Sequence, residues 1–164
     1  MSRWFPRFPT TNTEANVELR DFLREDQAAV RAVVLGGLAE RWGSVDESLN
    51  RDLDDIASSY SSGRTVVAEA HGVIVGTGSL QRRPDGPPEI VRMSVASTHR
   101  RLGIGRRIVD ELVATAAAWQ ATRVVLETST AWTDVTSFYL AEGFAITHVA
   151  RGEFGDDTWF ERLL

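Results

Sequence analysis

Two residue types are missing from this 164-residue chain. It contains no cysteine, which excludes disulfides, thiolate nucleophiles, zinc–sulfur sites and iron–sulfur clusters. It also contains no lysine, so all 18 basic residues are arginine. A Walker phosphate loop requires Gly-x-x-x-x-Gly-Lys-Ser/Thr, and the lack of lysine excludes that loop in its usual form.

Several other features are scarce. The three histidines (His71, His99 and His148) are scattered without the spacing of metal ligands, and we expect no metal site. No apolar run approaches the roughly 20 residues that span a bilayer, and residues 1–6 lack the apolar core of a signal peptide. The net charge of −5 does not favour nucleic-acid binding. We therefore expect a cytoplasmic protein with neither a membrane nor a nucleic-acid partner.

Length and composition indicate one globular domain. The chain is 43% hydrophobic and 25% charged, which is ordinary for a globular protein of this size. Residues 1–16 are rich in proline, threonine and asparagine and show no periodicity. We predict a flexible arm over residues 1–16 and a single domain over residues 17–164.

Hydrophobic periodicity predicts, in order, a strand, two helices, three strands, a helix, a strand, a helix and two strands. The expected strands are 17–20, 65–70, 73–80, 89–96, 123–128, 144–151 and 158–163, and the expected helices are 26–42, 46–60, 106–119 and 134–142. Residues 84–88 read as a loop, and residues 155–157 as a turn. This order indicates a single mixed α/β sheet without internal repeats.

The most informative stretch is residues 100–106, Arg-Arg-Leu-Gly-Ile-Gly-Arg. It follows an apolar strand-like run at 90–95 and opens a helical segment. The first N–H groups of a helix lack intrahelical partners and carry partial positive charge, so they can bind phosphate oxygens. Gly103 and Gly105 leave those groups uncovered. Four nearby arginines add positive charge: Arg100, Arg101, Arg106 and Arg107.

Two glycine patterns compete for this turn. A dinucleotide-binding Gly-x-Gly-x-x-Gly would use Gly103 and Gly105, with Glu127 as its acidic residue, and would indicate an oxidoreductase. Its third glycine position is Ile108, which is too bulky for close helix–strand packing. The other pattern, Gln/Arg-x-x-Gly-x-Gly/Ala, is met by Arg100 together with the same two glycines.

The second pattern continues downstream. The turn is followed by the strand at 123–128 and by Phe-Tyr-x-x-x-Gly-Phe at 138–144. In this order and spacing, the chain resembles the GCN5-related N-acetyltransferase (GNAT) superfamily, clearly over 89–150 and more weakly over 17–83. The resemblance implies a mostly antiparallel mixed sheet with helices on both faces. It also implies two parallel central strands, before and after the long helix, that splay apart at their carboxyl ends.

The resemblance implies acetyl-CoA as co-substrate. Backbone N–H groups of the turn would hold the pyrophosphate, and the exposed backbone of the preceding strand would pair with the pantetheine amides. The implied cofactor-binding residues are Met93, Ser94, Val95, Arg100, Arg101, Leu102, Gly103, Ile104, Gly105 and Arg106. Seven positions before the family's tyrosine, where many members have asparagine, this chain has Trp132. A hydroxyl could replace that contact, from Thr130, Thr133 or Ser137.

Two residues are candidates for proton transfer. By resemblance, Tyr139 is the general acid toward the leaving thiolate, although a phenol with a pKa of ~10 can equally act as a positioning donor. Glu127 ends an apolar strand twelve residues earlier, and its apolar neighbours should raise its pKa toward that of a general base. Glu69 is a second candidate base. Each of these side chains also has a purely structural interpretation.

These observations predict an acetyl-CoA-dependent N-acetyltransferase acting on a primary amine of a small molecule or peptide. The lack of cysteine excludes an acyl-cysteine intermediate and favours direct attack in a ternary complex. The alternative is a non-catalytic acyl-CoA-binding or sensing module. Residues 42–53 and 152–157 should contact the acceptor. The second segment is acidic, which suits a cationic amine or a solvated turn: Glu153, Asp156 and Asp157. The family resemblance also allows a homodimer.

Overall fold

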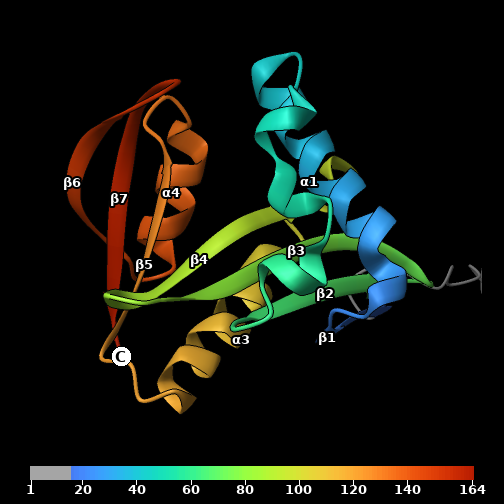
Figure 1. The fold of residues 1–164 in the computed structure, drawn as a ribbon, viewed down its shortest axis with the longest axis horizontal. Helices are drawn as coiled ribbons and strands as arrows, with labels where there is room; N and C mark the ends of the chain where they lie inside the picture. The colour runs from blue at the N-terminus through green and yellow to red at the C-terminus, as the bar shows by residue number, and fades with distance from the viewer. Residues whose placement is uncertain (1–15) are drawn as a thin grey trace, which may run out of the picture.

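The computed structural model describes residues 16–164, which build one seven-stranded sheet with helices on both faces (Figure 1). The strands are β1 (Val17–Asp21), β2 (Arg64–Ala70), β3 (Val73–Arg83), β4 (Gly86–Val95), β5 (Arg123–Ser129), β6 (Ala145–Gly152) and β7 (Gly155–Leu163). The helices are α1 (Gln27–Trp42), α2 (Ile56–Ser59), α3 (Ile104–Ala118) and α4 (Thr133–Ala141), with 3₁₀ turns η2 (Arg24–Asp26), η3 (Glu47–Leu49), η4 (Arg51–Leu53) and η5 (Ser97–His99). None of these helices is long and apolar enough to cross a membrane. The arm predicted for the first residues lies outside the described part of the chain, apart from Asn16.

The sheet order is β1-β2-β3-β4-β5-β7-β6, and its neighbours are antiparallel except at the centre. There, β4 and β5 run parallel and pair only at Glu89 and Val125. Both residues lie in the first half of their strands, so the two strands separate toward their carboxyl ends. The predicted mixed sheet with splayed central strands is confirmed.

Two hydrophobic cores lie on opposite faces of the sheet. α3 packs on one face, where Ile108 and Leu112 are fully buried, and α1 packs on the other (Figure 1). The adjacent residues Val66 and Val67 of β2 belong to different cores, because successive strand side chains point to opposite faces. The sheet is therefore covered on both sides along β2, β3 and β4.

The predicted first helix is confirmed as α1 and is pressed closely against β4. It ends at Gly43, whose φ of 76° is the left-handed conformation that glycine adopts readily. At Gly37 a Cβ atom would lie 2.6 Å from Ser94 Oγ, so a side chain there would displace the Ser94 hydroxyl from its present position. Ser94 Oγ instead donates a hydrogen bond to the Val33 carbonyl at 3.0 Å.

The helix predicted over residues 46–60 is wrong. The segment forms η3, η4 and the four-residue helix α2. The carboxylates of Asp46 and Asp55 accept hydrogen bonds from the backbone N–H groups of Ser48 and Ser58, at 2.9 and 3.0 Å. Short polar side chains of this kind compete with helical backbone bonds, and each begins a new turn.

Three predicted boundaries also move. The loop expected at 84–88 is shorter, because β4 already begins at Gly86, opposite Arg83. α3 begins at Ile104, two residues before its predicted start. The turn expected at 155–157 belongs to β7, which pairs from Gly155 with the end of β6.

Candidate active site

A cleft of about 1090 Å³ opens where β4 and β5 separate. Its walls come from the carboxyl halves of these two strands, the end of α1, the start of α3 and the helix α4. It is lined by eleven of the twelve predicted site residues: Met93, Ser94, Val95, Arg100, Arg101, Gly103, Ile104, Gly105, Arg106, Glu127 and Tyr139. The twelfth, Leu102, packs against the α3-side core instead. The fold thus gathers nearly all of the predicted residues around one cavity.

The first turn of α3 presents unpaired backbone donors to this cleft. Gly103 precedes the helix with a φ of 76°, which a residue with a side chain rarely adopts. Within the described residues, the N–H groups from Gly103 to Arg106 donate no hydrogen bond, and the first such bond is made by Arg107. These four donors and the positive end of the helix dipole suit a phosphate group.

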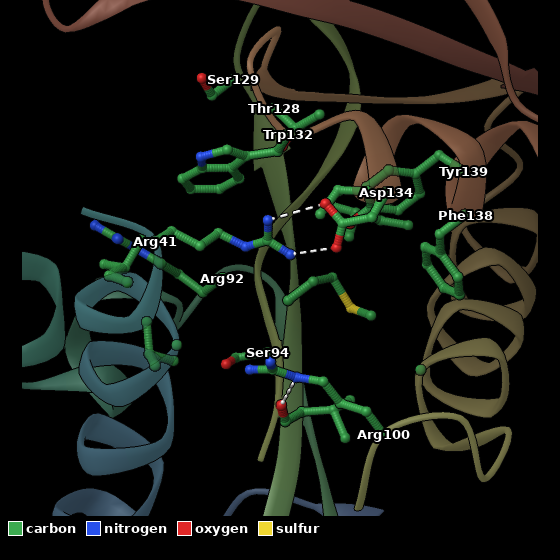
Figure 2. Close-up of a pocket in the computed structure, with 18 of the residues that line it drawn as sticks. Arg41, Arg92, Ser94, Arg100, Thr128, Ser129, Trp132, Asp134, Phe138 and Tyr139 are labelled. Carbon is green, nitrogen blue, oxygen red and sulfur yellow. Dashed lines mark hydrogen bonds and ion pairs between the residues drawn. The ribbon is translucent and has the colours of Figure 1, made fainter. Parts of the chain in front are cut away.

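The predicted arginine cluster divides into two kinds. Arg100 is a structural tie, because its Nε donates to the Val95 carbonyl at 2.9 Å and its Nη1 lies 2.7 Å from Glu40 (Figure 2). Arg107 similarly donates to a β1 carbonyl at 2.9 Å. Arg106 makes only a long contact, with its Nε 3.7 Å from a Glu142 carboxylate oxygen, and its side chain is 71% exposed at the cleft, where an anion can reach it.

Beyond Glu89, the backbone of β4 has no strand partner among the described residues on the side that faces the cleft. The register of β4 against β3 shifts between Val91 and Ser94, and Arg92 has a φ of 55°, which marks a bulge. After Glu89, β4 has no further pairing with β5. The backbone of 93–95 thus forms an open strand edge at the cleft, where, within residues 16–164, only the Val95 carbonyl accepts a side-chain hydrogen bond, from Arg100.

The bulge is held by a partly buried network of hydrogen bonds that the sequence did not indicate. Arg92 donates to both carboxylate oxygens of Asp52, at 2.6 and 2.8 Å, and to Asn50 Oδ1 at 2.9 Å. Tyr60 donates its hydroxyl to Asp52 at 2.5 Å. Burial favours a higher pKa for Asp52, but the hydrogen bonds from Arg92 and Tyr60 outweigh it and lower that pKa. The η3–η4 segment is thereby fastened to β4.

Tyr139 lies at the inner wall of the cleft. Tyr139 is 5% exposed, and its ring packs against Phe144 and Phe160 at centroid distances of 5.7 and 5.8 Å. Its hydroxyl makes no hydrogen bond within the described residues. Every fully buried side-chain polar atom in that part of the chain has a hydrogen-bond partner, so the Tyr139 hydroxyl is not fully buried. Because Tyr139 lines the cleft, its hydroxyl is exposed there. Burial raises the pKa of Tyr139, so the phenol stays protonated and able to donate.

Glu127 lies at an exposed position of β5 and lines the cleft. Partial desolvation raises its pKa, and the carboxylates of Asp157 and Glu89 raise it further, while Arg83 opposes them. A carboxylate with a raised pKa is suited to accept a proton. The other candidate base, Glu69, does not line the cleft and accepts hydrogen bonds from the arginine of β1.

Trp132 lines the cleft at the position where many family members have asparagine. Among the hydroxyls considered as replacements, Ser137 lines the cleft, whereas Thr130 and Thr133 do not. Ser137 donates to the backbone carbonyl four residues earlier at 2.9 Å. Its hydroxyl is thus turned toward its own helix in this structure.

The two segments expected to contact the acceptor reach the cleft only in part. From 42–53 only Trp42 lines it, and from the acidic segment Glu153 and Asp157 do, but Asp156 does not. The exposed side chain of Phe154 also lines it. Residues 16–164 contain no group of three histidine, aspartate or glutamate residues placed to hold a metal ion.

The sequence profile of the Acetyltransferase (GNAT) family matches residues 19–144. This chain belongs to that family. N-acetyltransferase 8B of Rattus norvegicus is 36% identical over 111 residues, which cover 63% of this chain and 50% of that protein. A probable N-acetyltransferase, camello of Xenopus tropicalis, is 31% identical over 119 residues, or 70% and 54% of the two chains. The chain spans about half the length of these curated relatives.

Solved structures share the fold at low sequence identity. A GNAT-family acetyltransferase from Staphylococcus aureus Mu50 superposes with a TM-score of 0.80 at 22% identity, over 90% of this chain and 99% of that one. A GNAT-family acetyltransferase from Elizabethkingia anophelis, solved with acetyl-CoA bound, gives 0.69 at 18% identity, over 92% and 99%. The seven-stranded architecture is therefore that of the family.

Proposed function

We propose that this protein is an acetyl-CoA-dependent N-acetyltransferase that transfers the acetyl group directly to a primary amine of a small molecule or peptide in a ternary complex. The observation that carries the proposal is the row of unpaired N–H groups from Gly103 to Arg106, beside the bulged edge of β4 that has no strand partner beyond Glu89. A pyrophosphate fits the first feature and an extended chain with amide groups fits the second. Acetyl-CoA contains both, and it is bound in the Elizabethkingia anophelis structure.

The two proton-transfer roles follow from the surroundings of each side chain. When bound, acetyl-CoA supplies the thioester that the amine attacks. Glu127 accepts the proton of the incoming amine, because desolvation and neighbouring carboxylates raise its pKa. Tyr139 donates a hydrogen bond or proton at the leaving sulfur, because its buried phenol stays protonated and its hydroxyl reaches the cleft.

The acceptor class is supported by charge. Glu127, Asp157 and Glu153 line the cleft on the side of β5 and β7, and none of them has an arginine salt-bridge partner among the described residues. An ammonium group entering there relieves the repulsion among these carboxylates. A cytoplasmic location and a homodimer remain predictions from the sequence.

The test measures thiol release from acetyl-CoA against a panel of primary amines. Glu127→Gln and Tyr139→Phe should each lower kcat by about tenfold to a thousandfold while leaving acetyl-CoA binding nearly unchanged. The kcat of the wild type should rise with pH as Glu127 loses its proton, and this limb should disappear in Glu127→Gln. Glu69→Gln is the matched control, because it makes the same change outside the cleft.

The outcomes separate the two functions considered. Unchanged turnover in both cleft variants would contradict the assigned roles. Saturable acetyl-CoA binding without thiol release for any amine would instead favour the non-catalytic acyl-CoA-binding or sensing module.

A further inference from the structure

A salt bridge crosses the cleft between two of its helical walls. Arg41, in the last turn of α1, donates to both carboxylate oxygens of Asp134, in the first turn of α4, at 3.0 and 2.7 Å (Figure 2). Its guanidinium also lies 4.9 Å from the ring centre of Trp132. The ring of Trp42 is 5.4 Å from that of Trp132. We call Arg41, Asp134 and Trp132 the clamp, and all three line the cleft.

The clamp separates two regions of the same cleft. In the view of Figure 2 the Arg41–Asp134 salt bridge is drawn between the labels of Ser94 and Arg100 and those of Thr128 and Ser129, and all of these residues line the same cleft. The first pair belongs to the β4 edge and the turn that would hold the cofactor. The second pair follows Glu127 at the carboxyl end of β5. Because the ion pair joins the α1 and α4 walls of the cleft, it narrows the opening through which an acceptor can reach the β4 edge.

The clamp has a defined closed form that can open without unfolding the protein. The planar guanidinium of Arg41 binds the Asp134 carboxylate along its edge and stacks on the Trp132 indole with its face. These two contacts fix the orientation of the guanidinium. Its hydrogen bonds lower the pKa of Asp134 to about 2, so both partners stay charged at neutral pH. The Asp134 side chain is 71% exposed, however, and an ion pair so open to water adds little to stability.

We propose that the clamp limits the width of the acceptor at the carbon that bears the nitrogen, so that unbranched primary amines are favoured over branched ones. This inference rests on the proposed acetyl transfer. The acceptor nitrogen must reach the gap between β4 and β5, and the guanidinium, carboxylate and indole cover that approach. A methyl branch next to the nitrogen widens the acceptor where it passes the clamp, and the ion pair must then break to admit it.

The experiment compares two amines of equal charge that differ by one methyl group, benzylamine and 1-phenylethylamine. Their dissociation constants are measured by calorimetry on the complex of the protein with CoA, which needs no turnover. We expect the wild type to prefer benzylamine by about tenfold, the size of discrimination that one carbon gives in a shaped pocket. The ratio of the two dissociation constants should fall close to one in Arg41→Ala and in Asp134→Asn.

Arg31→Ala is the matched control, because it removes another ion pair of α1, with Glu47 at 2.6 Å, outside the cleft. It should keep the tenfold preference. If Arg41→Ala fails to fold, Asp134→Asn gives the same comparison with a side chain of equal size. Thermal unfolding of each variant shows whether its fold is intact.

Three results would contradict the proposed role of the clamp. The first is a ratio of dissociation constants near one in the wild type, and the second is an unchanged ratio in both clamp variants. The third is that neither amine binds. Thiol release from acetyl-CoA is followed in the same proteins. Turnover without discrimination counts against the clamp alone. Discrimination in the CoA complex without turnover counts against the proposed function alone.

Discussion

Two arginines that line the cleft hold carboxylates in the same bidentate way but in different surroundings. Arg92 and Asp52 are 25% and 29% exposed, and Asn50 and Tyr60 complete their hydrogen bonds. The Arg41 side chain is similarly 27% exposed, but that of its partner Asp134 is 71% exposed. The arginines thus resemble each other, and the carboxylates do not.

The difference in burial decides what each pair can do. A carboxylate that is shielded from solvent keeps an uncompensated charge when it loses its partner. An exposed carboxylate is instead hydrated when its partner is removed. The first pair is therefore suited to hold the β4 bulge in place, where Arg92 has a φ of 55°. The second pair is suited to open and close across the cleft.

The largest expected effect is on the partly buried Arg92–Asp52 pair. Arg92→Ala should lower the free energy of unfolding by about 2 kcal/mol, because Asp52 loses its partner while still largely covered. Urea denaturation measures it, with Arg31→Ala as a surface control. A loss no larger than that of the control would show that the network does not hold the bulge.

An effect of intermediate size is expected when the pH is lowered, because the contribution of Asp52 to the free energy of unfolding depends on pH. The pKa of Asp52 is lowered in the folded protein, so its stabilising contribution is present above its ordinary pKa near 3.8 and is lost as pH falls through the lowered value. The stability gap between the wild type and Asp52→Asn should therefore be full at pH 6 and shrink as the pH falls below 4. Chemical denaturation across this range measures the gap, and a gap that widens with acid would contradict the assignment.

The smallest expected effect is on the exposed pair. Arg41→Ala should change the free energy of unfolding by less than about 1 kcal/mol, because the freed Asp134 carboxylate is already in contact with water. The same urea experiment measures it. A loss as large as that of Arg92→Ala would make the Arg41–Asp134 pair a structural brace rather than a clamp that opens.

Structural features that depend on residues close together in the chain could be predicted from the sequence. Gly43 ends α1, and Gly103 ends the turn that leads into α3, because each provides the positive φ that its position requires. The splayed sheet followed from the family resemblance, whose motifs lie within 89–150. The helix expected at 46–60 failed because Asp46 and Asp55 cap short turns, and hydrophobic spacing carries no information about that competition.

The two arginine pairs could not be predicted, because each joins residues far apart in the chain. Arg92 and Asp52 are 40 residues apart, and Arg41 and Asp134 are 93 residues apart. No local pattern distinguishes these arginines from the other sixteen, since the chain uses arginine for all 18 of its basic residues. Trp132 was visible only as a departure from the family, and its contact with Arg41 became apparent in the folded structure.

The most direct test of the central claim is a calorimetric titration of the protein with acetyl-CoA and, separately, with acetyl-pantetheine, which lacks the pyrophosphate and the 3′-phosphoadenosine joined to it. The unpaired N–H groups from Gly103 to Arg106 predict saturable one-to-one binding of acetyl-CoA and binding of acetyl-pantetheine that is weaker by about a hundredfold or more. No saturable binding of acetyl-CoA, or equal affinity for the two compounds, would contradict a pyrophosphate site at the start of α3.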